Sequence, residues 1–163
     1  MKFDSLIRIL EKQLKLYTSL YEIAISKVDV IKGNDISTLN QMMNNEQKHI
    51  TAITALENER IKELQQLFQT SSGSQPTMSE CIEKADIEQK LILEDLYKNL
   101  TDLLQKIKEQ NELNQELIQQ SLQFVNYSLD LFQPRTKSIN YGPPSGNKKA
   151  TPIGSRSIFN SQA

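Results

Sequence analysis

The sequence predicts an all-α protein: an elongated antiparallel three-helix bundle, coiled-coil-like, with an overlong third helix and a disordered C-terminal tail. Four of the five prolines follow Gln133, so the first 132 residues contain almost nothing that breaks a helix. Apolar residues recur there at alternating steps of three and four. The apolar fraction of 37% and the mean hydropathy of -0.51 suit a thin, extended core better than a thick globular one. We therefore divide the chain into a helical domain, residues 1–132, and a flexible basic tail with Pro and Gly, residues 133–163.

The first helix is expected over about residues 4–32. Its apolar residues form a seam of four heptads: Phe3, Leu6, Leu10, Leu14, Tyr17, Tyr21, Ala24, Val28 and Ile31. A short turn, Lys32-Gly33-Asn34-Asp35, follows. Gly33 can take the left-handed conformation that closes a helix, and Asp35 can accept hydrogen bonds from the amides that open the next one. So short a turn predicts antiparallel neighbours.

The second helix is expected over about residues 36–68, with a weaker seam. Charged Glu46 and Arg60 stand where apolar residues are expected. The inner side is formed by Leu39, Met43, Ile50, Ile53, Leu56, Leu64 and Leu67.

The third helix is expected to run unbroken over about residues 78–132, launched by a capping box from Thr77 to Glu80. At about 1.5 Å per residue it would measure about 80 Å, against about 45 to 50 Å for each of the others. Its last 20 or so residues would then extend beyond the bundle by on the order of 30 Å. This overhang is the most informative feature of the sequence.

The overhang carries an apolar face without a partner in the predicted bundle, and we expect another protein to bind there. The face comprises Leu113, Leu117, Ile118, Leu122, Phe124, Val125, Leu129 and Phe132. Among them, the polar residues Asn114, Gln115 and Gln119 either set the register of a bound helix or simply face water. The same face could instead pair with a second copy of itself.

Little in the sequence indicates other chemistry. One cysteine, Cys81, permits neither an intrachain disulfide nor a metal site, and is expected to be half-buried. One histidine, His49, is expected to face solvent. No phosphate loop, dinucleotide turn or ligand cluster is present, so we expect neither an enzyme nor a cofactor.

The predicted cellular location and the distribution of charge along the chain limit the functions that the protein could have. The sequence has no apolar run of transmembrane length and no secretory signal, which predicts a cytoplasmic protein. Residues 1–132 carry 14 basic and 20 acidic residues, whereas the tail carries five basic residues and no acidic one. Five dispersed cations are too dilute to indicate nucleic-acid binding.

The order of several short motifs resembles the FlgN-like flagellar chaperones over about residues 3–146. The motifs are Lys32-Gly33-Asn34-Asp35 before Leu39, Glu46-Gln47, Leu56-Glu57 with Arg60, Asn111, Asn114-Gln115 with Leu117-Ile118, Ser121-Leu122, and Tyr141-Gly142. The resemblance implies a cytosolic chaperone of flagellar type III export. Such a protein holds the hook-filament junction proteins FlgK and FlgL, through their C-terminal helical regions, until they are exported.

The resemblance also implies roles for particular residues. The end of the third helix would capture the client through the eight apolar residues together with Asn114 and Ser121. Tyr141, followed by Gly142, matches the position that helps the loaded chaperone dock on the export gate protein FlhA; Tyr127 is a weaker match. The extension over residues 147–163 departs from the shorter family pattern.

Two other readings stay open at this point. One is a structural coiled-coil protein whose long helix serves self-association, giving a homodimer in the absence of any client. The other is an export chaperone for a different flagellar client, such as the filament cap protein or flagellin. The sequence does not distinguish FlgK from FlgL.

Overall fold

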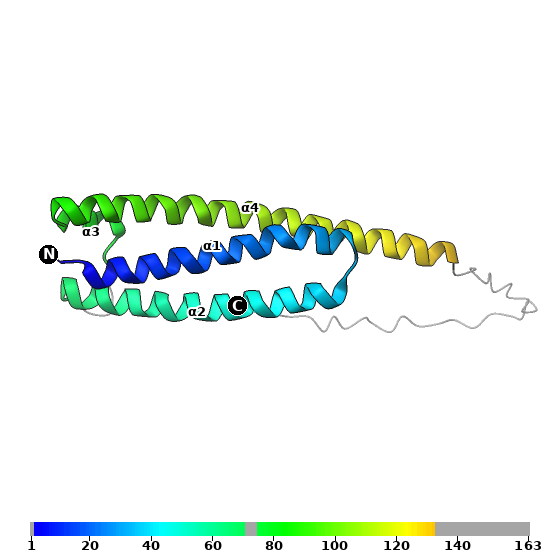
Figure 1. Ribbon diagram of the computed structural model, residues 1–163, viewed down its shortest axis with the longest axis horizontal. Coiled ribbons are helices and arrows are strands. Elements are labelled where there is room, and N and C mark those ends of the chain that lie inside the picture. Colours follow the sequence, from blue (N-terminus) through cyan, green and yellow to red (C-terminus); the bar gives the residue numbers. More distant parts are fainter. Residues whose placement is uncertain (1, 71–74, 133–163) are drawn as a thin grey trace, which may run out of the picture.

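The computed structural model describes residues 2–70 and 75–132, which form four helices and no strand (Figure 1). The helices are α1 (Asp4–Lys32), α2 (Ile36–Phe68), α3 (Met78–Lys84) and α4 (Ile87–Phe132). The predicted all-α class is confirmed. The tail, with Tyr141 and Gly142, lies outside the described residues.

Helix α1 lies between α2 and α4 and packs along both (Figure 1). Gln13 bonds to Glu57 and Ser19 to His49, so α1 and α2 run in opposite directions. The Phe3 amide bonds to Gln89, and the Ala24 carbonyl to Asn114, so α1 and α4 run in the same direction. No close backbone contact joins α2 to α4 in the described ranges.

The central position of α1 requires two packing faces, and the sequence supplies both. The predicted seam includes Ala24, beside Asn114 of α4. A second stripe, centred about 100° away at 100° per residue, includes Gln13 and Lys27, which bind Glu57 and Glu46 of α2. The members of this second stripe are Ile9, Gln13, Leu16, Leu20, Ile23, Lys27 and Val30.

The best-buried part of the core lies at the end where the chain begins. Phe3, Leu6 and Leu93 are fully buried, and the Phe3 ring packs against Phe68 with centroids 6.3 Å apart. Cys81 of α3 is also fully buried in this cluster, not half-buried as predicted. Burial raises the pKa of its thiol, which makes the residue a packing group.

The turn between α1 and α2 differs from the prediction in one residue. Gly33 has right-handed geometry, with φ of -80°, and Asn34 takes the left-handed conformation, with φ of 53°. Asn is the non-glycine residue best suited to this region. Asp35 caps α2 as predicted, since its side chain accepts a hydrogen bond from the Thr38 amide at 3.1 Å.

The prediction of one unbroken third helix is wrong. The capping box of Thr77 and Glu80 is present, but the helix that it opens ends at Lys84. Ala85 is extended, with ψ of 152°, and Asp86 starts α4 by accepting a hydrogen bond from the Gln89 amide at 2.9 Å. Asp86 followed three residues later by Gln89 is a local pattern typical of a helix start, and it could have predicted the break from the sequence.

This break shortens the overhang. The hydrogen bonds from the Phe3 amide to Gln89 and from Asn114 to the Ala24 carbonyl join residues 86 and 90 positions apart, so Lys32 stands beside roughly residues 118 to 122 of α4. About ten residues remain beyond that level, or about 15 Å of helix, not the 30 Å predicted. Residues 78–86 account for the difference, because they cover the opposite end of the core and do not lengthen α4.

Candidate protein-binding surface

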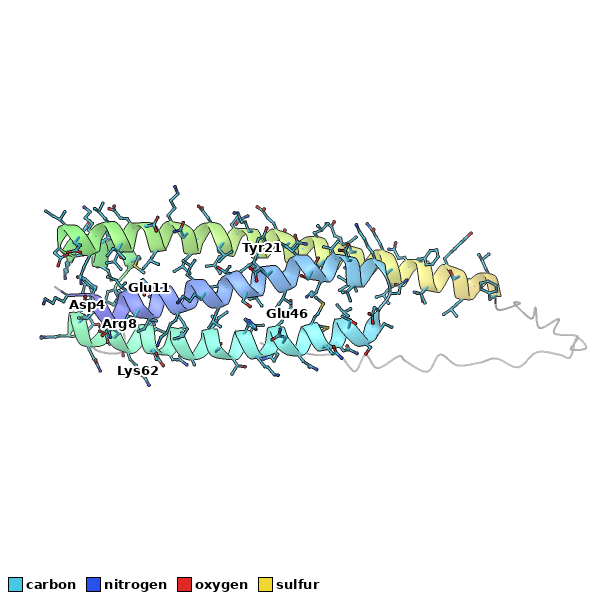
Figure 2. All side chains as sticks on the ribbon, viewed as in Figure 1. Asp4, Arg8, Glu11, Tyr21, Glu46 and Lys62 are labelled. Carbon is cyan, nitrogen blue, oxygen red and sulfur yellow. The ribbon has the colours of Figure 1, made fainter. Side chains whose placement is uncertain are left out.

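The end of α4 exposes large apolar side chains. Leu122, Phe124 and Phe132 are 57%, 66% and 85% exposed, and Leu113, Val125 and Leu129 are exposed as well. Leu117 and Ile118 are partly buried, because α1 still covers them. Figure 2 shows side chains standing around this end of α4 beyond the α1–α2 turn, with no other helix beside them. So much exposed apolar surface indicates a binding site.

Two hollows lie beside the α1–α2 turn. One, of about 170 Å³, is almost wholly apolar and joins α4 to the ends of α1 and α2. It is lined by Val30, Ile31, Asn34, Asp35, Ile36, Leu39, Ile118, Ser121, Leu122 and Val125. The other is lined by Lys32, Asn34, Leu117, Gln120, Ser121 and Phe124. Each hollow has a wall of predicted binding residues and a wall from the turn.

The structure therefore brings together Leu117, Ile118, Ser121, Leu122, Phe124 and Val125. Leu129 and Phe132 lie further along α4, and Leu113 lies before the turn; none of these three lines either of the two hollows described above. The sequence analysis missed the contribution of Val30 and Ile36. The second stripe of α1, which ends at Val30, was the signal that could have revealed it.

Asn114 does not belong to the exposed surface. Its side chain is 2% exposed, and its Nδ2 donates a 2.7 Å hydrogen bond to the Ala24 carbonyl. Its Oδ1 accepts a hydrogen bond from Gln110 at 3.1 Å. Because a buried amide is costly unless it is paired, these bonds favour one alignment of α4 along α1. Gln115 and Gln119 are exposed.

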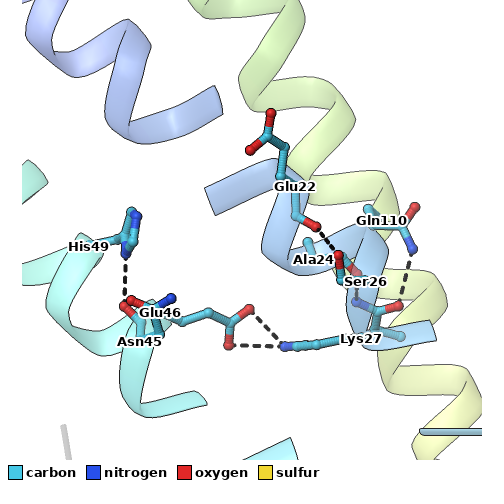
Figure 3. A network of polar contacts seen from close by, with 9 residues as sticks. Glu22, Ala24, Ser26, Lys27, Asn45, Glu46, His49 and Gln110 are labelled. Atoms are coloured by element: carbon cyan, nitrogen blue, oxygen red, sulfur yellow. Dashed lines mark hydrogen bonds and ion pairs between the residues drawn. The ribbon is translucent and has the colours of Figure 1, made fainter. Parts of the chain in front are cut away.

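The polar residues that interrupt the seam of α2 are paired. Lys27 Nζ lies 2.8 and 3.0 Å from the two carboxylate oxygens of Glu46, and both side chains are mostly buried. Dashed lines mark this pair in Figure 3. Arg60 binds Glu57, its neighbour on the same helix. Both seam interruptions are therefore neutralised by a partner of opposite charge.

The prediction that His49 faces solvent is wrong. Its ring is partly buried, with Nε2 2.8 Å from Ser19 Oγ and Nδ1 2.9 Å from the Asn45 carbonyl. Both ring nitrogens are occupied, which gives the residue a role in joining α1 to α2.

In residues 2–70 and 75–132, no group of His, Cys, Asp and Glu side chains could hold a metal ion. Within the same ranges, no helix combines the length and the apolar character that crossing a membrane requires.

Comparison with known proteins identifies the family. The chain is 32% identical to "Uncharacterized protein YvyG" of Bacillus subtilis (strain 168) over 141 residues, which cover 86% of this chain and 87% of the relative. No solved structure matches significantly. Residues 1–149 match the family described as FlgN protein. The chain, whose α4 ends in an exposed apolar surface, thus belongs to the FlgN family of flagellar chaperones.

Proposed function

We propose that this protein is a cytoplasmic export chaperone for the hook-filament junction proteins FlgK and FlgL. It binds their C-terminal helical regions, prevents their premature assembly and delivers them to the flagellar type III export gate through FlhA. In this proposal α1, α2 and α4 act as one elongated antiparallel three-helix bundle that presents the end of α4. The protein acts by binding and not as an enzyme.

The observation that carries the proposal is the exposed apolar surface at the end of α4, together with the two hollows beside the turn. A client helix that lays its apolar face there would bury side chains such as Leu122, Phe124 and Leu129. Each buried side chain of this size contributes about 1.5 to 3 kcal/mol, which is enough to offset the ordering of a client segment. Recognition of an amphipathic helix by an apolar groove is a common mode of binding.

The chaperone would prevent assembly of the client because it covers the client surface that polymerises. The terminal helices through which flagellar axial proteins polymerise would lie against α4 while the chaperone is bound. The proposed client-binding residues are therefore the predicted set, with Asn114 in a supporting role through its bond to α1.

Calorimetry with the full-length chain and the C-terminal region of FlgK or FlgL tests the proposal. The wild-type chain should bind with micromolar or tighter affinity. Phe124→Asp with Leu129→Asp, both at positions more than half exposed, should abolish binding without loss of helical content. The matched control, Gln123→Asp with Asn126→Asp, places the same charges on the polar side of the same turns and should bind like the wild type. Absence of binding by the wild-type chain to either client would overturn the proposal.

The heptad spacing of the exposed apolar residues favours one alternative, self-association of α4. Analytical ultracentrifugation of the full-length chain without client distinguishes the two. A stable dimer that the Phe124→Asp and Leu129→Asp pair dissociates, with no client binding, would support the structural coiled coil.

A further inference from the structure

The end of α4 carries two apolar stripes, not one. The first, here called the Val125 stripe, comprises Ile118, Leu122, Val125, Leu129 and Phe132, at steps of four and three. The second, the Phe124 stripe, comprises Leu113, Leu117, Phe124, Tyr127 and Leu131. At 100° per residue their centres lie about 140° apart. Ser121 and Ser128 stand between them.

Each stripe leads away from a different hollow. Val125 and Leu122 line the apolar hollow formed with α2, whereas Phe124 and Leu117 line the hollow beside Lys32. Ser121 and Asn34 line both hollows, so the α1–α2 turn lies over the serine row and separates the two stripes. Beyond the turn, no described residue covers either stripe.

Helix α1 shows what such a pattern requires in this fold. Its two stripes, about 100° apart, are each covered by a separate helix, α4 on one and α2 on the other. A single helix typically covers an apolar face about 100° wide, because its axis stays 8 to 10 Å from that of its neighbour. One helix cannot cover two stripes about 140° apart.

We propose that the partner of α4 supplies two amphipathic helices, one seated on the Val125 stripe and one on the Phe124 stripe. Together they enclose the end of α4 as α2 and α4 enclose α1. The inference rests on the proposed function, since the two helices belong to one client chain. It adds that the client is a helical pair and not a single helix.

Charge indicates that the partner is not a second copy of this chain. Between Glu109 and Phe132 the sequence holds four acidic residues and no basic one. Two copies paired along these ends would bring acidic edges together, whereas client helices with Lys or Arg beside their apolar residues would complement them. The interface also continues an existing one, because both hollows open at the end of the α1–α4 contact.

Photocrosslinking in the full-length chain tests the inference, with benzoylphenylalanine placed at Leu129 on one stripe or at Leu131 on the other. Both positions are more than half exposed, so the probe should be tolerated. In the complex with the C-terminal region of FlgK or FlgL, the two probes should crosslink to two different helical segments of the client. A probe at Asn126, on the polar side, should give little crosslinking.

Affinity supplies an independent readout. Leu129→Asp and Leu131→Asp should each weaken client binding at least about tenfold, since each removes one apolar anchor. If both probes reach the same client segment, or if only one substitution weakens binding, the two-helix inference is wrong and the proposed function stands. If the wild-type chain forms no complex with either client, both are wrong. Crosslinks between two copies would show that a second copy covers the stripes, and crosslinks to the tail of the same chain would show that the tail does. Either result would overturn the inference.

Discussion

Polar side chains within the interfaces of α1 determine how the helices align along their axes. Asn114 bonds to Ala24, Lys27 to Glu46, and Ser19 to His49. Apolar side chains tolerate a shift by one heptad, because any apolar residue can replace another, but each of these bonds requires its own partner. The polar residues among the apolar stripes therefore fix where the end of α4 meets the turn.

Asn114→Ala should lower the free energy of unfolding by about 1 to 2 kcal/mol, because a buried hydrogen bond is lost and a small void remains. Urea unfolding measures this change. Asn111→Ala is the matched control, since Asn111 is exposed on the same helix and should cost less than about 0.5 kcal/mol. Equal costs for the two substitutions would contradict the assigned role.

Glu57 should contribute to the decrease in the free energy of unfolding at acidic pH. Hydrogen bonds from Arg60 hold the pKa of this carboxyl below its ordinary value, against the opposing effect of burial. The unfolded chain therefore takes up the proton at a higher pH than the folded chain. The stabilisation is complete above the unfolded pKa of about 4.3 and is lost as the pH falls through the lower folded value.

Glu57→Gln should flatten the decline of unfolding free energy below about pH 4.5. The effect should stay below about 1 kcal/mol, because the side chain is 42% exposed and solvent screens the pair. Denaturant titrations from pH 3 to 7 measure it. Glu59→Gln, an exposed neighbour on α2, serves as the control, and an identical acid limb for wild type and Glu57→Gln would refute the prediction.

At the scale of elements, the break between α3 and α4 sets the length of the exposed end. Asp86 starts a new helix beside the first residues of α1, where Gln89 accepts a hydrogen bond from the Phe3 amide and donates one to Asp4. Helix α3 meanwhile places Cys81 over the core. A continuous helix could not do both, since its first turns would project past Phe3.

Asp86→Ala should destabilise the fold by about 1 kcal/mol, because the first turn of α4 loses its N-cap. Thermal or urea unfolding measures the loss. Glu94→Ala, at an exposed position within α4, should change stability much less. A cost for Asp86→Ala no larger than that control would show that the break does not depend on the cap.

At the scale of the whole molecule, client capture and gate docking are expected to occupy different parts of the chain. The proposed client surface lies on α4, whereas Tyr141 and Gly142 belong to the tail, outside the described residues. An aromatic side chain is suited to filling a pocket on a partner. Tyr141→Ala should therefore leave client affinity unchanged and weaken docking of the loaded chaperone on FlhA by at least about tenfold.

Calorimetry of the loaded chaperone with the cytoplasmic domain of FlhA measures this effect. Tyr127→Ala provides the comparison: Tyr127 is 64% exposed on the Phe124 stripe and should weaken client binding instead. Equal gate binding by wild type and Tyr141→Ala would exclude the docking role of this residue.

The sequence by itself determined the helical class, the limits of α1 and α2, the cap at Asp35 and the capping box at Thr77, because local spacing and local hydrogen bonds encode them. It also identified six of the apolar residues that α4 exposes, although Leu117 and Ile118 of the same set are partly buried and the exposed Leu131 was not among them. Tertiary structure alone decided that α1 lies in the middle, that α3 covers the core and that Asn114 is buried while Phe124 is not. These outcomes depend on which helices pack together and on how they are aligned along their axes. Periodicity along one helix records that a face is apolar, but not which neighbour covers it or where that neighbour ends.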